Sequence, residues 1–255
     1  MLAIFKREFL SYFRTPVGYV ALAIFTFISG FNFYTLFSYG YISISDEINS
    51  LRSLFIIIVP IITMGMFAED RKRGTEVLYF TSPVNLFSVI LGKFLSAMLL
   101  CFVMFINVFI HMIVVSACGG RIGIGVWGSV LVFFFMGALF ISIGLFASVI
   151  SDNQIISAIV CFLIILLNNL MSVIGEYMGI SVSTVMSYMG MDVTARDNVK
   201  SAVTKAISWF DPFVKTNEFR NGVFSASALV FCLSFAIFFL YLSFRILEKK
   251  RWSQK

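Results

Sequence analysis

The chain has 255 residues, of which 60% are hydrophobic, 13% are charged and 31 are phenylalanine. Soluble domains carry roughly 25% charged residues, so this composition excludes a soluble globular enzyme and a disordered protein. The formal net charge is +6, an excess that we attribute to cytoplasmic basic loops of a membrane protein and not to a nucleic-acid partner. The length fits a single transmembrane domain over residues 1–255.

The first segment, residues 1–16, mixes apolar and charged residues at helical spacing. Such a helix has an apolar face for the lipid and a charged face for water, and Pro16 would break it before the first apolar run. We therefore predict an interfacial helix, with a ragged extension of the first span as the alternative. Its apolar face carries Leu2, Phe5, Phe9, Tyr12 and Phe13, and its charged residues are Lys6, Arg7, Glu8 and Arg14.

Six later segments are apolar enough to cross a bilayer as helices, a crossing that takes roughly 20 residues. Basic residues concentrate in the loops on one side, and only Arg52 and Arg121 lie in the short loops on the other. This asymmetry predicts a multi-pass protein of a prokaryotic cytoplasmic membrane with both termini in the cytoplasm. The spans run from about Val17 to Phe37, Leu54 to Phe67, Phe94 to Ala117, Val126 to Ile150, Ile155 to Ile174 and Val223 to Leu247. The second is short, and a helix that starts in the preceding loop would extend it.

The loop at residues 69–92 holds the densest cluster of charges in the chain. Gly74 can turn the backbone and Thr75 can cap a short helix through Phe80, which Ser82-Pro83 ends. Val77, Leu78 and Tyr79 would then face water, and exposed apolar groups on a charged platform indicate a protein partner. The alternative is an ordinary basic cytoplasmic loop. The charges are Glu69, Asp70, Arg71, Lys72, Arg73 and Glu76.

The loop at residues 175–222 is the only sizeable aqueous segment, and the predicted topology places it outside. Thr194 to Phe210 is amphipathic at helical spacing, and Asp211-Pro212 ends it. Ile180 to Met189 is a second candidate short helix. We expect these helices to lie on the outer leaflet or to cap a pathway, with a structured loop that has no role in transport as the alternative.

Catalytic and metal-binding patterns are absent from the sequence. The glycine-rich run Gly119–Gly125 lacks a following Lys-Ser/Thr and is interpreted as a turn, while the four cysteines are interpreted as small hydrophobic residues. We see no chain of ionisable residues through the spans, which argues against an ion-coupled carrier. We therefore expect no enzyme activity, no bound cofactor and an energy source on another subunit. Four polar residues inside the spans are interpreted as helix–helix hydrogen bonds, with a functional role as the alternative: Asn107, His111, Asn168 and Asn169.

Several stretches together resemble a known family. They are KREFLSYFRTPVGYV near the start, AEDRKRGTEVLYFTSPVNLFSVILGKF, SDNQIISAI, and EFRNGVFSASALVFCLSF. In this order they resemble the permease subunit of type-2 ABC transporters, most closely the gliding-motility-type and copper-processing-type permeases. The resemblance implies an all-α membrane protein with six spans, an ATP-driven exporter, and a dimer with a second copy or a related membrane subunit.

The resemblance also implies roles for particular segments. The N-terminal helix would lie beside a cytoplasmic ABC ATPase subunit that binds ATP and Mg²⁺, and Thr75–Phe80 would be the coupling helix docked on it. The long loop 175–222 could instead bind an extracellular or membrane partner, which leaves a scaffold subunit that does mechanical work as the alternative function. The residues implied in coupling are Glu69, Arg71, Arg73, Gly74, Thr75, Glu76, Leu78 and Pro83.

Overall fold

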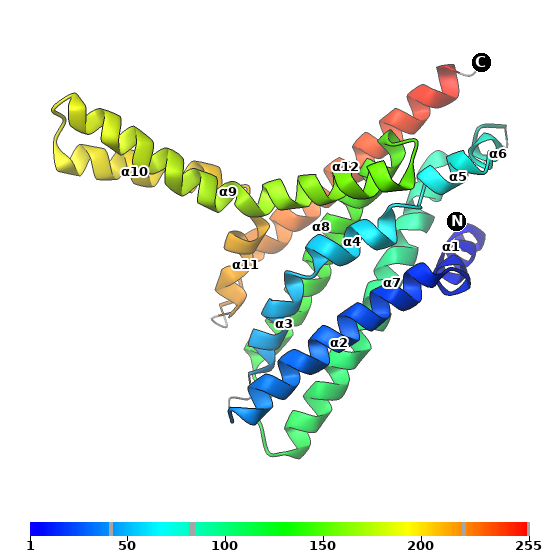
Figure 1. The fold of residues 1–255 in the computed structure, drawn as a ribbon, viewed down its shortest axis with the longest axis horizontal. Coiled ribbons are helices and arrows are strands. Elements are labelled where there is room, and N and C mark those ends of the chain that lie inside the picture. The colour runs from blue at the N-terminus through cyan, green and yellow to red at the C-terminus, as the bar shows by residue number, and fades with distance from the viewer. Residues whose placement is uncertain (41–42, 82–84, 221–222, 254–255) are drawn as a thin grey trace.

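The computed structural model describes residues 1–40, 43–81, 85–220 and 223–253, and within these ranges it is all helical, as predicted. Figure 1 shows the helices as a bundle from which one long hairpin extends. The helices are α1 (Leu2–Arg14), α2 (Pro16–Ser38), α3 (Ile44–Arg52), α4 (Phe55–Thr63), α5 (Ala68–Lys72), α6 (Glu76–Thr81), α7 (Leu86–Ala117), α8 (Ile124–Ile150), α9 (Gln154–Tyr188), α10 (Val193–Ser208), α11 (Pro212–Arg220) and α12 (Ala226–Ser253).

Five of the described helices are long and apolar enough to cross a membrane: α2, α7, α8, α9 and α12. The number rises to six when Ile44–Arg52 and Phe55–Lys72, which meet at a bend of 52°, are taken as one broken span. The predicted second span, from about Leu54 to Phe67, lies within the second half of this pair, and α3 is the helix in the preceding loop that extends it. Within that half, α4 ends at Thr63 and a turn follows it. Nine residues rise only about 14 Å as a helix, so α4 needs its neighbours to complete a crossing.

Helix α8 is the centre of the bundle. It packs against α3, α4, α7, α9, α11 and α12. Of the residues in its most apolar 18-residue stretch, 78% are buried. Phe133 is the centre of an aromatic cluster: its ring centroid lies 4.6 Å from that of Phe55, 4.7 Å from that of Phe105 and 6.0 Å from that of Phe25. A Cβ at Gly144 would come within 2.2 Å of the Thr63 hydroxyl oxygen, so α4 and α8 can approach this closely only because the residue is glycine.

Helix α9 is much less buried than α8, since only 17% of the residues in its most apolar 18-residue stretch are buried. Its 35 residues rise about 52 Å, well beyond a hydrocarbon core of about 30 Å. Figure 1 shows α10 returning along α9, so that the pair extends from the bundle as a hairpin. The prediction of a separate short helix from Ile180 to Met189 is wrong, because α9 continues to Tyr188. The amphipathic helix predicted from Thr194 corresponds to α10, and α11 begins at Pro212.

The bundle has two distinct ends, visible in Figure 1. Both termini lie at one end together with α1, α5 and α6, and we call this the α6 end. The connection from α2 to α3 and the turn from α7 to α8 lie at the opposite end, which we call the α3 end. The glycine-rich run 119–125 supplies that second turn, as predicted, with Gly119 at a φ of +85°.

Candidate functional site

Helix α6 is set at an angle to α5 by a tight turn at Gly74 and Thr75. Gly74 has a φ of +70°, a conformation that glycine adopts without a steric cost. The Thr75 amide donates to the Asp70 carbonyl at 2.9 Å, and its hydroxyl donates to the Asp70 carboxylate at 3.0 Å. Thr75 therefore bonds back to α5, and this fixes the turn itself, where the sequence suggested a cap on the next helix.

The six-residue helix α6 has one exposed face and one buried face. Val77 and Leu78 are 51% and 61% exposed, as predicted, but Tyr79 is only 8% exposed. The expectation that Tyr79 faces water is therefore wrong: its hydroxyl donates to Asp70 at 2.9 Å and accepts a hydrogen bond from Arg7. Burial raises the pKa of the Tyr79 phenol above its ordinary value, so this hydroxyl keeps its proton as a donor. Pro83, the predicted end of this helix, lies outside the described residues.

Lys93 is the most buried charge at this end. It falls between the predicted loop 69–92 and the predicted span from about Phe94, and it lies within α7 with 1% of its side chain exposed. Its ammonium contacts the Asp70 carboxylate at 2.7 Å and the Glu8 carboxylate at 3.1 Å, and it donates to the Met66 carbonyl. An ammonium has three donors and burial without partners is costly, so these three acceptors explain how it is tolerated. Arg7, Glu8, Asp70, Tyr79 and Lys93 are called the Lys93 network below.

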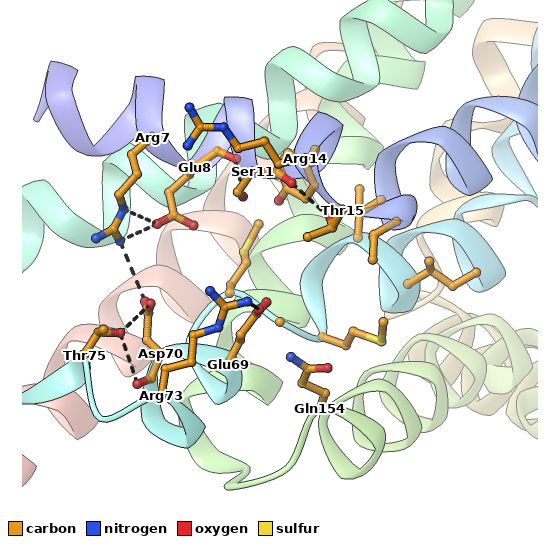
Figure 2. A pocket seen from close by; sticks show the side chains of 17 residues that line it. Arg7, Glu8, Ser11, Arg14, Thr15, Glu69, Asp70, Arg73, Thr75 and Gln154 are labelled. Carbon is orange, nitrogen blue, oxygen red and sulfur yellow. Dashed lines mark hydrogen bonds and ion pairs between the residues drawn. The ribbon is translucent and has the colours of Figure 1, made fainter.

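The Lys93 network joins helices that are distant in the sequence. Glu8 and Arg7 come from α1, Asp70 from α5, Tyr79 from α6 and Lys93 from α7. Figure 2 shows Arg7 and Glu8 of α1 facing Asp70 across the mouth of a cleft. The network thus connects α6, through Tyr79 and Asp70, to the first turns of α7 and to α1.

Arg71 forms a second connection from α6. Its guanidinium pairs with Glu76 at 2.8 Å and with Asp152 at 2.6 Å, and it donates to the carbonyls of Ser151 at 2.7 Å and Val149 at 3.1 Å. Lys250 of α12 donates to the same Val149 carbonyl at 3.0 Å. Arg71 therefore ties α5 and α6 to the turn between α8 and α9. Both acidic and basic members of the predicted coupling set come together here.

Three further charged residues of the predicted site, Arg14, Glu69 and Arg73, line a cleft of about 460 Å³ between α1, the α4–α5 segment and the start of α9. Figure 2 shows Arg14 and Gln154 on its walls and Glu69 beside Arg73. Glu69 and Arg73 form an ion pair on α5, and Ile61, Ile62 and Met64 add an apolar wall. The cleft walls are thus partly charged and partly apolar. Lys6 is exposed and does not line this cleft.

The four polar residues predicted inside the spans have different environments. His111 hydrogen-bonds across helices, at 2.7 Å to Glu47 of α3. The buried Asn107 amide nitrogen has no hydrogen-bond partner among the described residues. Asn169 donates to the Ile165 carbonyl of its own helix at 3.3 Å, and Asn168 beside it is half-buried.

Ionisable residues are buried in the bundle, although the sequence shows no chain of such residues through the spans. Glu47, Arg52 and Lys93 are all at least 97% buried. Sequence reasoning missed the first two because α3 is short and amphipathic, and its charged residues read as an exposed loop. A detectable signal was the i, i+4, i+7 spacing of Ile44, Ile48 and Leu51, which marks one buried helical face. Among the described residues, no group of three or more metal-ligating side chains is arranged to hold a metal ion.

A family model described as "ABC-2 family transporter protein" matches residues 2–252. The chain belongs to the ABC-2 family of transporters. It is the membrane-spanning permease subunit of an ABC transporter, in agreement with its apolar helices. Membership implies an ABC ATPase as partner, since the ABC-2 permease region carries no ATPase domain. No curated protein matches the chain.

Proposed function

We propose that a separate cytoplasmic ABC ATPase, which binds ATP and Mg²⁺, docks on α6 and drives this ABC-2 permease. The observation that carries the proposal is the two-sided character of α6. Leu78 is 61% exposed on its outer face, whereas Glu76 and Tyr79 on its inner face bond to Arg71 and Asp70. An exposed leucine beside charged residues suits a protein groove, and the inner bonds link that contact to the bundle.

In this proposal the Lys93 network and the contacts of Arg71 carry the motion produced by nucleotide binding. A displacement of α6 moves Tyr79 and Asp70, and through Lys93 it moves the foot of α7. The same displacement moves Glu76 and Arg71, and with them the turn between α8 and α9. Charge-assisted hydrogen bonds are short and directional, so they transmit displacement better than apolar contacts, which can slide.

The proposed orientation places the α6 end in the cytoplasm. Exposed basic residues lie there, among them Lys6, Arg14, Lys72 and Arg73, as the positive-inside tendency requires. Helix α1 would then lie at the inner membrane surface beside the ATPase, with its aromatic residues in lipid. Phe5, Phe9 and Phe13 form a continuous row of ring contacts along it.

We further propose that two membrane subunits, a second copy or a related chain, form the pathway. Exposed apolar residues on α2 and α9 do not decide this, because lipid also covers such surfaces. The support comes from Asn168 and Asn169, which are half-buried polar residues at membrane depth on the sparsely covered α9. Polar side chains at that depth usually face protein or a water-filled pathway. Within the family we favour the gliding-motility-type or copper-processing-type branch, on the motifs quoted above.

The test is Leu78→Asp, with Met189→Asp as the matched control. Both replace an exposed apolar side chain by a carboxylate, but Met189 is 74% exposed at the tip of the α9–α10 hairpin. We expect Leu78→Asp to reduce co-purification of the ATPase and permease-stimulated ATP hydrolysis at least tenfold, with an unchanged melting temperature. Met189→Asp should retain both. Normal ATPase association in Leu78→Asp would refute docking on α6. Glu76 is a poorer probe, because it is buried against Arg71.

A second candidate function is a scaffold that uses the ATPase stroke for mechanical work on an external partner. The observation in its favour is the α9–α10 hairpin, which extends from the bundle in Figure 1. Its tip exposes Tyr188, Met189 and Met191. The double variant Tyr188→Ser and Met191→Ser should release such a partner while ATPase stimulation stays intact. Retention of every co-purifying protein would favour transport without an external partner.

A further inference from the structure

A compact polar site at the α3 end joins three helices. The Glu47 side chain is fully buried on α3. Its Oε1 accepts a hydrogen bond from the Ser29 hydroxyl of α2 at 2.9 Å, and lies 2.7 Å from His111 Nδ1 of α7. Phe33 stacks on the imidazole, with ring centroids 4.2 Å apart and planes 12° apart. The imidazole is therefore held in one orientation, with Nδ1 aimed at the carboxylate.

The second carboxylate oxygen of Glu47 accepts no hydrogen bond from the described residues. This oxygen, Oε2, is buried. A small cavity of about 10 Å³ borders Glu47, and its walls are Phe33, Leu36, Phe37, Ser43, Ile44 and Glu47 itself. A volume of this size is at the lower limit for one water molecule. The site thus has an acceptor without a donor and room for at most a single water beside it.

The charge around Glu47 comes from few groups. Of the helices packed on α3, neither α2 nor α8 contains a charged residue in its sequence, and α7 contributes His111 here with Lys93 at its opposite end. Helix α11 carries three charged residues, Lys215, Glu218 and Arg220, and Lys215 lies over the Trp209 ring. On α3 itself, Arg52 donates to Thr216 and Asn49, and Asp46 is only half-buried. With a neutral imidazole, Glu47 would be a buried anion that contacts no cation within the described part of the chain, which is costly.

We propose that Glu47 and His111 form a proton-binding site that takes up one proton from the solution on the α3 side. A water-borne proton adds to the pair, either at Oε2 or on the imidazole, and the water that delivered it returns to the solution. The pair then has no net charge and bonds α2, α3 and α7 together. Release of the proton at higher pH leaves a buried anion and loosens this contact. The packing of the outer half of the permease therefore responds to external pH.

The experiment uses the fact that His111 is the only histidine. Full-length protein with ¹⁵N-labelled histidine, reconstituted in lipid nanodiscs, gives a single pair of imidazole signals without an assignment step. We expect these signals to shift over one pH transition between about pH 5 and 9. In Glu47→Gln the transition should move by at least one pH unit, which is a tenfold change in proton affinity, or disappear from this range. Imidazole signals that do not move with pH, or an identical midpoint in Glu47→Gln, would overturn the proposal.

Two further variants make the test specific. Asp46→Asn removes the neighbouring, half-buried carboxylate of the same helix, and we expect an unchanged midpoint because Glu47 is the carboxylate bonded to His111. A shift as large as that of Glu47→Gln would assign the effect to the general charge of α3 and overturn the proposal. Ser29→Ala keeps both titrating groups, so it serves if Glu47→Gln does not fold. Loss of the serine donor changes the hydrogen bonding of the carboxylate, so the midpoint should differ from that of the wild type, and an identical midpoint would contradict the site.

Discussion

The two ends of the bundle both bury ionisable residues, but they neutralise them in different ways. At the α6 end, Lys93 contacts two carboxylates and a carbonyl, and Arg71 contacts two further carboxylates. At the α3 end, Glu47 is bonded to one serine and one histidine. Lysine and arginine keep their charge near neutral pH, whereas an imidazole does not. Under the two proposals above, the first end therefore transmits force at any physiological pH, and the second responds to pH.

The largest expected effect comes from Lys93→Met at the α6 end. Removing this ammonium leaves Asp70 and Glu8 without their buried cation, and breaking a buried ion pair in this way costs about 3–5 kcal/mol. We expect that loss in the free energy of unfolding in lipid bicelles, together with loss of ATPase stimulation. Lys72→Met is the control, because Lys72 is exposed on the same helix as Asp70. A loss no larger than that of the control would show that the network does not stabilise the bundle.

The next effect is expected at the α3 end, from Ser29→Ala. This change removes a fully buried hydroxyl that donates to the Glu47 carboxylate. Hydrogen bonds to charged groups contribute about 1.5–3 kcal/mol, so the free energy of unfolding should fall by about 2 kcal/mol. Ser234→Ala on α12 is a suitable control, since that exposed hydroxyl bonds only to its own helix at Val230. Equal losses in the two variants would mean that Ser29 contributes no more than an ordinary helix serine.

A smaller effect is expected from Tyr79→Phe, which keeps the ring but removes the hydroxyl between Arg7 and Asp70. The expected loss is about 1 kcal/mol, the net contribution of one hydrogen bond, because Lys93 still neutralises Asp70. ATPase stimulation should fall more than stability does, since α6 loses its link to α7. Chemical unfolding and ATP hydrolysis on the same preparation separate the two quantities. If Tyr79→Phe stimulates ATP hydrolysis as the wild type does, Arg71 alone would connect the motion of α6 to the bundle.

The smallest effect is expected from Arg73→Ala. Arg73 pairs with Glu69 one turn earlier on α5, and its side chain is 66% exposed. Exposed ion pairs contribute about 0–1 kcal/mol because water and salt screen them, so the unfolding free energy should change by less than 1 kcal/mol. The comparison with Lys93→Met in the same assay tests whether burial, and not charge alone, decides the size of the effect. A loss above about 2 kcal/mol in Arg73→Ala would contradict this.

Much of the fold follows from the sequence because hydropathy and helix signals are local. The apolar runs at α2, α7, α8 and α12, the short helix after Gly74 and the amphipathic α10 all appear near the predicted residues. The exposure of Leu78 follows from its place in a charged loop. The broken second crossing was harder to foresee, since its apolar run gives no sign of the bend between α3 and α4.

Only the tertiary structure decided which charges are buried and which residues they meet. Lys93 and Asp70 are 23 residues apart in the chain, and His111 and Glu47 are 64 apart. A lysine in a basic loop and a glutamate in a polar segment carry no local mark of burial, because their environment is set by helices packed from elsewhere. The sequence by itself determined that this chain is a helical membrane permease. The folding of α1, α3, α5 and α6 onto α7 decided where its charges act.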